Sequence, residues 1–308
     1  MGTPEFSVPM LKAIHDSEYE LAGVVTAPDK PSGRGRKLSK SAVKQFAEKH
    51  GIPIYQPTNL KSEEFNRQLQ ELDPNVIVVV AFRMLPETVW AYPEYGTFNL
   101  HASLLPNYRG AAPINWAIMN GEKETGLTTF FIDEKIDTGE IIDNVRIRIE
   151  DDDDVSDLYE KMLPEGKALV METLQKIRSG DVKTKSQAKS DAGLKIAPKL
   201  TKENMRIDWN KPAEEICNQI RGLSPFPLAW TMLVNEKENI LCKIASVKCA
   251  ADTSDMPAGS ILIKNKSMYV HTGEGMVEIL KIKMSGKRLM DVQTLLNGYT
   301  IAENSKLV

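Results

Sequence analysis

Asn99 and His101 stand two residues apart, shortly after an apolar run at residues 76–82 that predicts a buried strand. If the segment around them is also extended, both side chains project from one face, because side chains alternate along a strand. The Asn99 amide could donate a hydrogen bond to a developing oxyanion, and the imidazole could donate a second one or shuttle a proton. An isolated pair of this kind is more often the polar face of a surface strand.

Asp137 supplies a possible third member of this group. A carboxylate beside the imidazole would fix its tautomer and orientation. Together, the three side chains suit nucleophilic attack on a carbonyl. No Ser or Cys stands in a nucleophile-elbow sequence, so we expect no covalent acyl-enzyme, and the attacking nucleophile would belong to a substrate.

The elements that must position these residues follow a repeating strand–helix pattern. Strands are expected at residues 19–26, 52–55, 76–82 and 126–132, and helices at 41–50, 62–72, 112–119 and 155–179. Short connections between them predict an α/β fold with a mostly parallel, doubly wound sheet and helices on both faces. Ligands bind such sheets beyond the carboxyl ends of the strands, where Arg83 and His101 are expected.

The first residues, Met1-Gly2-Thr3-Pro4, resemble the turn between a strand and a helix, with a proline where the first helical turn needs no N–H. Nothing stands before this turn to supply the strand. We therefore expect a first strand to be missing before Met1.

Residues 29–40 form a loop rich in Gly, Pro and positive charge. The G-K-[ST] ending of a Walker loop is missing. A basic loop is usually a solvated surface segment, although Arg and Lys on flexible glycines could also hold a polyphosphate or a nucleic-acid backbone. The acidic run at residues 150–154 lacks the alternating ligands of a calcium loop, so we expect it to cap the helix at 155–179 and to bind no metal.

The second half of the chain changes character. Residues 181–205 contain regularly placed lysines and predict a basic linker, after a first domain at 1–180. Residues 206–308 contain several short strand-like runs with turns between them, which predict a small β-barrel domain. The charge of that domain is nearly balanced, and it does not decide whether nucleic acid binds there.

Composition narrows the class of protein. The chain has 308 residues, a net charge of -3 and a pI near 5.9, which give no overall indication of nucleic-acid binding. Its apolar runs are far shorter than the ~20 residues of a membrane span, and no signal peptide opens it, so we expect a cytoplasmic protein with no membrane contact. Cys217, Cys242 and Cys249 lack C-x-x-C spacing and are expected to be free thiols.

The ordered motifs together resemble the 10-formyltetrahydrofolate-dependent formyltransferases. The sequence NLHASLLP at 99–106 is followed by YRGAAPINW at 108–116 and DTG at 137–139. The opening MGTPEF and the RGRK at 34–37 narrow the resemblance to members that use methionyl initiator tRNA. Further matches at IAPKLTKE (196–203), IDW (207–209) and RGLSPFP (221–227) extend it over essentially the whole chain.

This resemblance implies a Rossmann-like catalytic domain and an OB-like C-terminal barrel that binds tRNA. The donor would be 10-formyltetrahydrofolate, and the acceptor the α-amino group of methionine on initiator tRNA, for translation initiation. Asn99, His101 and Asp137 match the catalytic positions. The matching folate-binding residues are Arg83, Met84, Leu85, Ser103, Leu104, Leu105, Pro106, Asp133 and Ile136, and the matching tRNA-binding residues are Arg34, Arg36, Lys37 and Lys40.

Other functions remain open. The acceptor could be another amine, such as that of a nucleotide sugar, or the protein could hydrolyse formyltetrahydrofolate. A catalytically silent tRNA-binding protein is a third possibility, although it would have no need for Asn99, His101 and Asp137. The basic loop and the lysine-rich linker favour an RNA acceptor, and nothing in the sequence requires more than a monomer.

Overall fold

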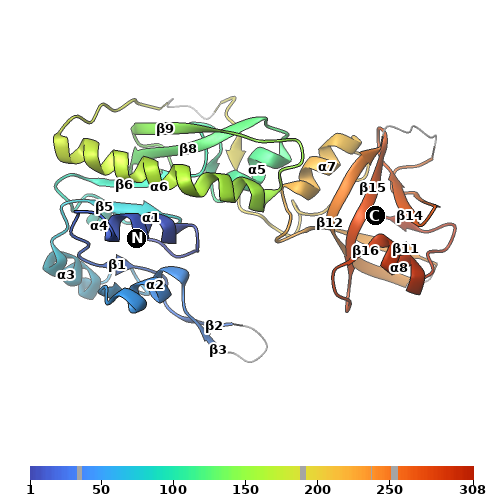
Figure 1. Cartoon of the computed structure of the whole chain (residues 1–308), viewed down its shortest axis with the longest axis horizontal. Coiled ribbons are helices and arrows are strands. Elements are labelled where there is room, and N and C mark those ends of the chain that lie inside the picture. The colour runs from blue at the N-terminus through green and yellow to red at the C-terminus, as the bar shows by residue number, and fades with distance from the viewer. Residues whose placement is uncertain (33–36, 188–191, 237, 251–255) are drawn as a thin grey trace. The chain divides into compact units, whose positions relative to one another are not determined.

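The computed structural model describes the chain except residues 33–36, 188–191, 237 and 251–255 (Figure 1). It contains two compact units, and each takes up several stretches of the sequence. The first unit comprises Met1–Gly110, Thr125–Ile147 and Glu160–Ile196. The second comprises Ala111–Glu124, Arg148–Tyr159 and Ala197–Val308.

The first unit is built on a four-stranded sheet in the order β5-β6-β8-β9. Its strands are β5 (Ile77–Val80), β6 (Thr97–His101), β8 (Glu124–Phe131) and β9 (Ile141–Arg148). β5 and β6 are parallel, as predicted, but β6 and β8 are antiparallel. The helix between β6 and β8, α5 (Pro113–Met119), belongs to the second unit, so it does not form the crossover that a parallel β8 would need.

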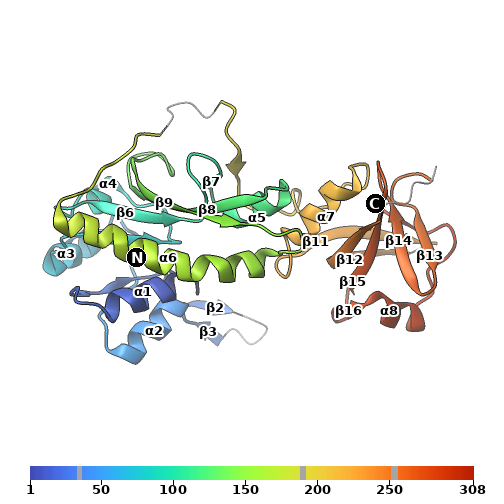
Figure 2. The ribbon, with the colours of Figure 1, turned by 45° about the horizontal axis from the view of Figure 1, so that its top comes forward.

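Helices cover both faces of this sheet, as the sequence predicted. On one face, Gly166 of α6 (Val155–Ser179) packs against Met10 of α1 (Ser7–His15) and Leu100 of β6. On the other face, α3 (Glu63–Leu72) and α4 (Glu87–Trp90) pack on Ile77 and Val79 of β5. Figure 2 shows α6 running along the sheet. The predicted cap of α6 is confirmed, because the carboxylate of Asp154 accepts hydrogen bonds from two backbone N–H groups of its first turn.

A second part of this unit has short strands. β1 (Val24–Val25) runs parallel to β4 (Ile54–Tyr55), and the strand expected at residues 19–26 shrinks to these two residues, since β4 offers only two partners. β2 (Lys30–Ser32) and β3 (Lys37–Ser39) form an antiparallel pair, and β7 (Arg109–Gly110) pairs with β10 (Ile196–Ala197). The helix α2 (Ala42–His50) follows β3.

Met1 and Gly2 lie between β1 and β5, in the place of a strand. Gly2 donates to the carbonyl of Val25 and forms a parallel bridge with Val80. The terminal amine of Met1 lies 2.6 Å from the carbonyl oxygen of Val78, and burial lowers its pKa to about 5. Beside these two residues is a cavity of about 600 Å³, lined by residues that include Leu21, Val24, Val76 and Val78.

The second unit contains a curled, antiparallel sheet in the order β13-β14-β15-β12-β11-β17, with β16 paired to β15. A register shift between Ile244 and Val247 interrupts the long strand β12. The bounds are β11 (Ala229–Asn235), β12 (Glu238–Ala250), β13 (Ile261–Lys264), β14 (Ser267–His271), β15 (Met276–Met284), β16 (Met290–Asp291) and β17 (Lys306–Leu307).

Two helices complete the core of this unit. α7 (Ala213–Arg221) contributes Ile216 and Ile220, and α8 (Val292–Gly298) contributes Val292 and Leu295. The expectation of three free thiols is wrong for two of them, because Cys217 and Cys249 form a disulfide between α7 and β12, 32 residues apart in sequence. Cys242 is free and buried, and burial raises its pKa to about 11.

Candidate active site

Asn99 and His101 lie on the same face of β6. In the parallel ladder Asn99 is opposite Val79, whose side chain belongs to the cluster beneath α3 and α4, so this face is the one opposite α6. Asn99 is half-buried and His101 is buried. Within the described part of the chain the Asn99 amide has no hydrogen-bond partner, which leaves its donors available.

The surroundings of His101 determine its tautomer. Its Nε2 lies 2.9 Å from the backbone oxygen of Tyr108, and a carbonyl oxygen can only accept, so Nε2 carries a proton. The other ring nitrogen, Nδ1, lies 3.8 Å from Oδ2 of Asp137, which is too far for a direct hydrogen bond. Nδ1 is therefore the nitrogen that can exchange a proton with a bound molecule.

Asp137 is held in place by its neighbours. Its Oδ2 accepts a hydrogen bond of 2.9 Å from the backbone N–H of Gly110, and its backbone has a left-handed φ of 56°. Two residues on, the loop passes so close to β8 that a Cβ on Gly139 would lie 1.7 Å from the carbonyl oxygen of Phe131. Only glycine fits there, and this close passage allows the loop to place Asp137 beside His101.

The predicted folate-binding residues differ in what they expose. Met84 is 74% exposed and Ile136 is 62% exposed, although both are apolar. Ser103 is fully buried, and its hydroxyl donates to the carbonyl of Asn107. Leu105 is buried, while Leu104 and Pro106 are half-buried. The segment 103–106 is therefore a folded wall rather than a free loop.

Two polar members of that set are used locally. The guanidinium of Arg83 donates to the carbonyl oxygens of Pro57 and Thr58. Oδ1 of Asp133 accepts from the hydroxyl of Thr138 at 2.7 Å and shapes its own loop. Leu85 is buried beneath α4. A ligand in this region would meet apolar side chains and backbone atoms more than these two charged groups.

Two of the predicted tRNA-binding residues, Lys37 and Lys40, lie on and directly after β3. Arg34 and Arg36 are outside the described residues, and Lys37 begins β3. The ammonium of Lys40 lies 2.7 Å from a carboxylate oxygen of Glu48. That hydrogen bond raises the pKa of Lys40, so the ammonium stays charged, and its charge is paired with the carboxylate of Glu48.

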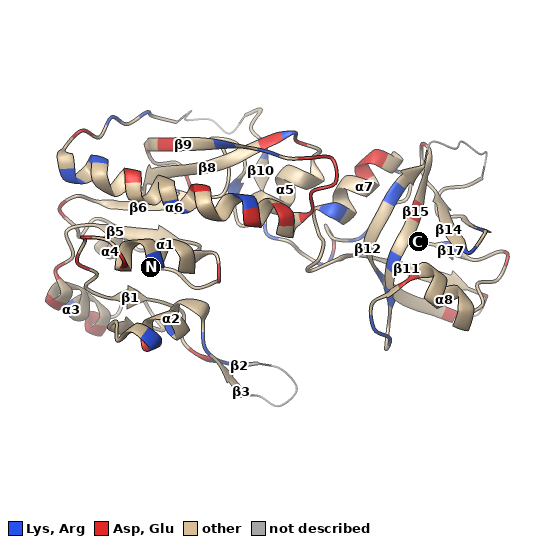
Figure 3. Ribbon diagram, viewed as in Figure 1, with Lys and Arg blue, Asp and Glu red and all other residues tan. Residues whose placement is uncertain are grey.

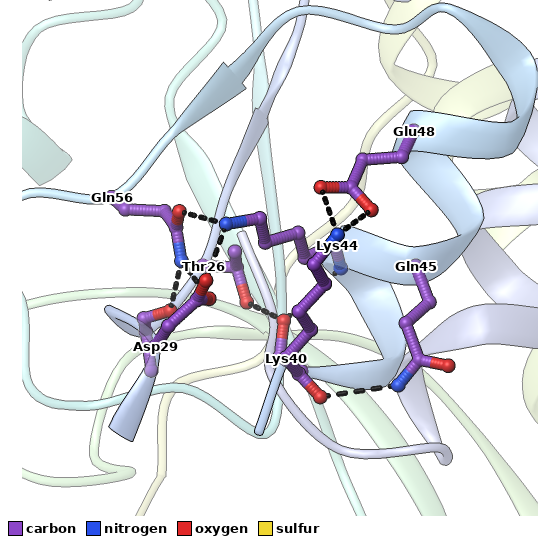
Figure 4. Close-up of polar contacts among 9 residues, drawn as sticks. Thr26, Asp29, Lys40, Lys44, Gln45, Glu48 and Gln56 are labelled. Carbon is purple, nitrogen blue, oxygen red and sulfur yellow. Dashed lines mark hydrogen bonds and ion pairs between the residues drawn. The ribbon is translucent and has the colours of Figure 1, made fainter. Parts of the chain in front are cut away.

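A polar network fixes the base of this pair (Figure 4). Lys44 of α2 donates to Asp29 at 2.7 Å and to Gln56 at 2.8 Å, and Gln56 donates to Asp29 at 2.9 Å. These contacts hold the pKa of Asp29 below its usual range. Ser41 caps α2 and shares a hydrogen bond of 2.7 Å with Thr26. The chain entering and leaving the basic loop is thus anchored by side chains.

Neither a metal site nor a membrane span is found among the described residues. No group of three or more His, Cys, Asp or Glu side chains there could hold a metal ion. None of the helices in the described ranges has the length and apolar character needed to cross a membrane.

Two family models match the chain. The model described as formyl transferase covers residues 1–174, and that of the formyl transferase C-terminal domain covers residues 199–300. The chain belongs to the formyl transferase family. Among the members it resembles are methionyl-tRNA formyltransferases from Flavobacterium johnsoniae, 47% identical over 100% of this chain and 97% of the relative, and from Bacteroides fragilis, 47% identical over 100% and 96%.

Solved structures share the formyl transferase fold. A sugar 3N-formyl transferase, solved in the presence of dTDP and 5-N-formyl-THF, superposes with a TM-score of 0.65 at 23% identity, over 93% of this chain and 97% of that one. An N-formyltransferase from Helicobacter canadensis in complex with folinic acid and dTDP-3-aminofucose gives 0.63 at 21% identity, over 90% and 96%.

Two residues of the site had no role in the sequence analysis. Tyr108 and Gly110 contact His101 and Asp137 through backbone atoms. Both lay inside the motif at 108–116, but a backbone contact leaves no trace in the type of side chain. Only their place between the two predicted residues could have drawn attention to them.

Proposed function

We propose that this formyl transferase moves the formyl group of 10-formyltetrahydrofolate to the α-amino group of methionyl initiator tRNA, which supplies formyl-methionyl-tRNA for translation initiation. The observation that carries the proposal is the meeting of His101 and Asp137 beside Asn99, in a chain 47% identical over its whole length to a methionyl-tRNA formyltransferase.

The residues assigned to the folate donor fit an extended, partly aromatic molecule. Met84 and Ile136 present exposed apolar surface, and Leu104 and Leu105 form part of the wall at 103–106. Structural relatives were solved with 5-N-formyl-THF or folinic acid. We assign donor binding to Met84, Leu85, Ile136 and residues 103–106, with Arg83 and Asp133 holding the loops that carry them.

In the mechanism we propose, the bound donor supplies a formyl carbon that the methionyl amine attacks. The bond from that carbon to the folate nitrogen then breaks, and the leaving nitrogen takes up the proton that the amine gives up. Asn99 donates an amide N–H to the formyl oxygen as negative charge develops there. His101, with Nε2–H held by Tyr108, donates from a protonated Nδ1 to the same oxygen. Asp137 steadies the imidazolium and accepts the proton from the amine before it passes to the folate nitrogen. Holding both substrates together supplies much of the rate.

Basic and aromatic side chains of the second unit support an RNA acceptor. Lys202 and Arg206 lie over the ring of Trp230. Nζ of Lys202 is 5.4 Å from the ring centroid, and Cζ of Arg206 is 5.6 Å from it. Across the sheet Trp230 is opposite Lys243, which is opposite Lys283. Figure 3 shows basic positions on β12 and the strands next to it. We assign this row, with the loop that carries Arg34, to contact with the phosphate backbone.

We extend the proposal to the finer features of the molecule. The first unit is Rossmann-like and the curled second sheet is OB-like. Along the sequence we assign catalysis to a domain at 1–180, a linker to 181–205 and tRNA binding to a domain at 206–308, while residues 111–124 and 148–159 pack with the second unit and residues 181–196 with the first. The protein acts as a monomer in the cytoplasm, where charged initiator tRNA is made and used.

The test is a formylation assay with 10-formyltetrahydrofolate and charged initiator tRNA. We expect formyl-methionine from the unaltered protein, and His101→Ala should lower turnover by about 10²-fold or more while tRNA affinity stays nearly the same. His50→Ala is the matched control, because His50 is exposed on α2 and should retain full activity.

The same assay separates the rival functions. Release of formate without tRNA would identify a hydrolase, and formylation of a nucleotide-linked amino sugar in place of tRNA would identify a different acceptor. Near-normal turnover in His101→Ala would refute the assignment of that residue.

A further inference from the structure

Gln187 joins two parts of the site that are far apart in sequence. Its side-chain oxygen accepts from Arg109, at 2.7 Å from Nη2 and 3.2 Å from Nε. Its side-chain nitrogen donates to the backbone oxygen of Asp137 at 3.1 Å and to that of Gly139 at 2.7 Å. One amide thus bridges a buried guanidinium and the loop that carries Asp137.

The chemistry of these four contacts matches an amide and no other side-chain group. Two carbonyl oxygens need two N–H donors, and a guanidinium needs an acceptor, and an amide provides both at its two ends. A carboxylate would place oxygen against oxygen at Asp137 and Gly139. An apolar side chain of the same size would leave the guanidinium and the two carbonyls without this partner.

Arg109 is the residue between the two backbone groups that hold the His–Asp pair. Tyr108, before it, accepts from Nε2 of His101, and Gly110, after it, donates to the carboxylate of Asp137. Asp137 itself has a left-handed φ of 56°, a conformation that is unfavourable for a non-glycine residue and persists where neighbours impose it. Gln187 supplies such a neighbour.

The segment before Gln187 is fixed to the same loop. Lys185 and Ile141 exchange backbone hydrogen bonds of 2.8 Å and 2.9 Å, and the hydroxyl of Ser186 donates to the carboxylate of Glu140 at 3.0 Å. The backbone next to Gln187 is therefore fixed to this loop, and that fixed backbone positions the Gln187 side chain.

We propose that Gln187 is a positioning residue for formyl transfer. It ties Arg109 to the backbone at 137–139 and thereby sets the Asp137 carboxylate at its distance from Nδ1 of His101. This inference rests on the proposed function, because it assigns Gln187 a role in the reaction of the same site. Gln187 itself touches neither reacting group.

The test replaces Gln187 in the full-length protein and measures formylation of charged initiator tRNA in steady state and in single turnover. We expect Gln187→Met to lower kcat by about 10- to 100-fold, because a displacement of about 1 Å at a reacting group can cost 10²-fold. The KM values for both substrates should change by less than about threefold, since Gln187 contacts neither. Gln187→Glu should be slower still, and Gln187→Asn, which keeps the amide, should lie between Gln187→Met and the unaltered protein.

Gln70→Met is the matched control, because Gln70 is exposed on α3, and it should retain full kcat. A double-mutant cycle with Asp137→Asn separates positioning from a general loss of structure. If Gln187 acts through Asp137, Gln187→Met should cost less than about threefold in the Asp137→Asn background.

Each result has one meaning. Failure of the unaltered protein to formylate tRNA overturns the proposed function. Formylation by the unaltered protein with an unchanged kcat in Gln187→Met overturns the positioning role, and so does an equal loss in both backgrounds of the cycle. If Gln187→Met does not fold, the comparison of Gln187→Asn with Gln187→Glu decides, and equal kcat values for those two contradict the proposal.

Discussion

At the scale of single residues, the carbonyl of Tyr108 decides which nitrogen of His101 is available. Because Nε2–H is already held, a proton can enter or leave the ring only at Nδ1, and the nearest carboxylate oxygen to it is 3.8 Å away. That spacing keeps Nδ1 open to a bound substrate, so a proton taken up there can be donated to a substrate oxygen while the negative charge of Asp137 still acts on the ring.

Arg34 and Lys40 of the basic loop should contribute differently to tRNA binding, and the salt dependence of binding should distinguish them. Arg34→Ala should weaken tRNA binding and reduce the slope of log Kd against log salt by about 1, as expected when one phosphate contact is lost. Lys40→Ala should change the slope less, because the Lys40 ammonium is already paired with Glu48. Binding isotherms at several salt concentrations measure both. An unchanged slope for Arg34→Ala would count against phosphate contact by this loop.

Site residues could be predicted from the sequence where their role follows from side-chain type and spacing, but not where they contact the backbone of a distant loop. The two-residue spacing of Asn99 and His101 places them on one face of a strand, and that follows from sequence alone. Gln187 acts on a loop 50 residues away, at Asp137, through backbone oxygens. No pattern of residue types reveals such a contact, because almost any residue could offer the same carbonyl.

At the scale of elements, Met1 and Gly2 occupy the position of a strand between β1 and β5 and form backbone hydrogen bonds with both. The buried amine of Met1 has its pKa lowered to about 5 from 8.0, so between those values the unfolded chain binds more protons than the folded one. Stability should therefore rise with pH across that window. The neighbouring cavity of about 600 Å³ also lowers stability, because the apolar side chains that line it have no packing partners inside it.

We expect five or six apolar, β-forming residues added before Met1 to raise the melting temperature by at least about 4 °C. They would convert the amine to an amide and place apolar side chains against Val24 and Val78. Thermal unfolding between pH 5 and 8 measures the effect. An extension of Gly and Ser is the control, since it removes the amine and its pH dependence but fills the cavity poorly. Equal melting temperatures for the two extensions would contradict a role for the cavity.

Among the elements, the helices were the easiest to predict. Ser41 and Ser62 cap α2 and α3 where the apolar periodicity begins, so the starts of these helices are determined by nearby residues in the sequence. The direction of β8 could not be predicted, because it depends on α5 belonging to the second unit. The bond between Cys217 and Cys249 was missed for a similar reason, since its two ends meet only when α7 packs on β12.

At the scale of the whole molecule, the second unit borrows two stretches from the middle of the sequence. Asn115 of α5 donates to the carbonyl of Gly222 at 2.8 Å, and Arg221 of α7 donates to that of Asp153 at 2.8 Å. A Cβ on Gly222 would lie 2.6 Å from Met119, so α5 and α7 are in close contact. Gly222 and Arg221, at the end of α7, therefore have partners that precede them by 107 and 68 residues.

A fragment of residues 199–308 should be less stable than the same sheet in the full chain, because it lacks these partners. We expect faster amide exchange in α7 of the fragment, by at least about tenfold, and a lower melting temperature. Asn115→Ala in the full chain should give a smaller change of the same sign, and Asn144→Ala, at an exposed position on β9, should give none. Equal protection of α7 in the fragment and in the full chain would contradict the borrowed packing.

The interleaving of the two units also bears on how the protein is made. Residues 111–124 leave the ribosome about a hundred residues before α7, so α5 must wait, with its apolar side uncovered, until its partner is synthesised. At about 5–20 residues per second that interval lasts on the order of ten seconds. During synthesis α5 is therefore accessible to chaperones and to misassociation until α7, which ends at Arg221, has left the ribosome.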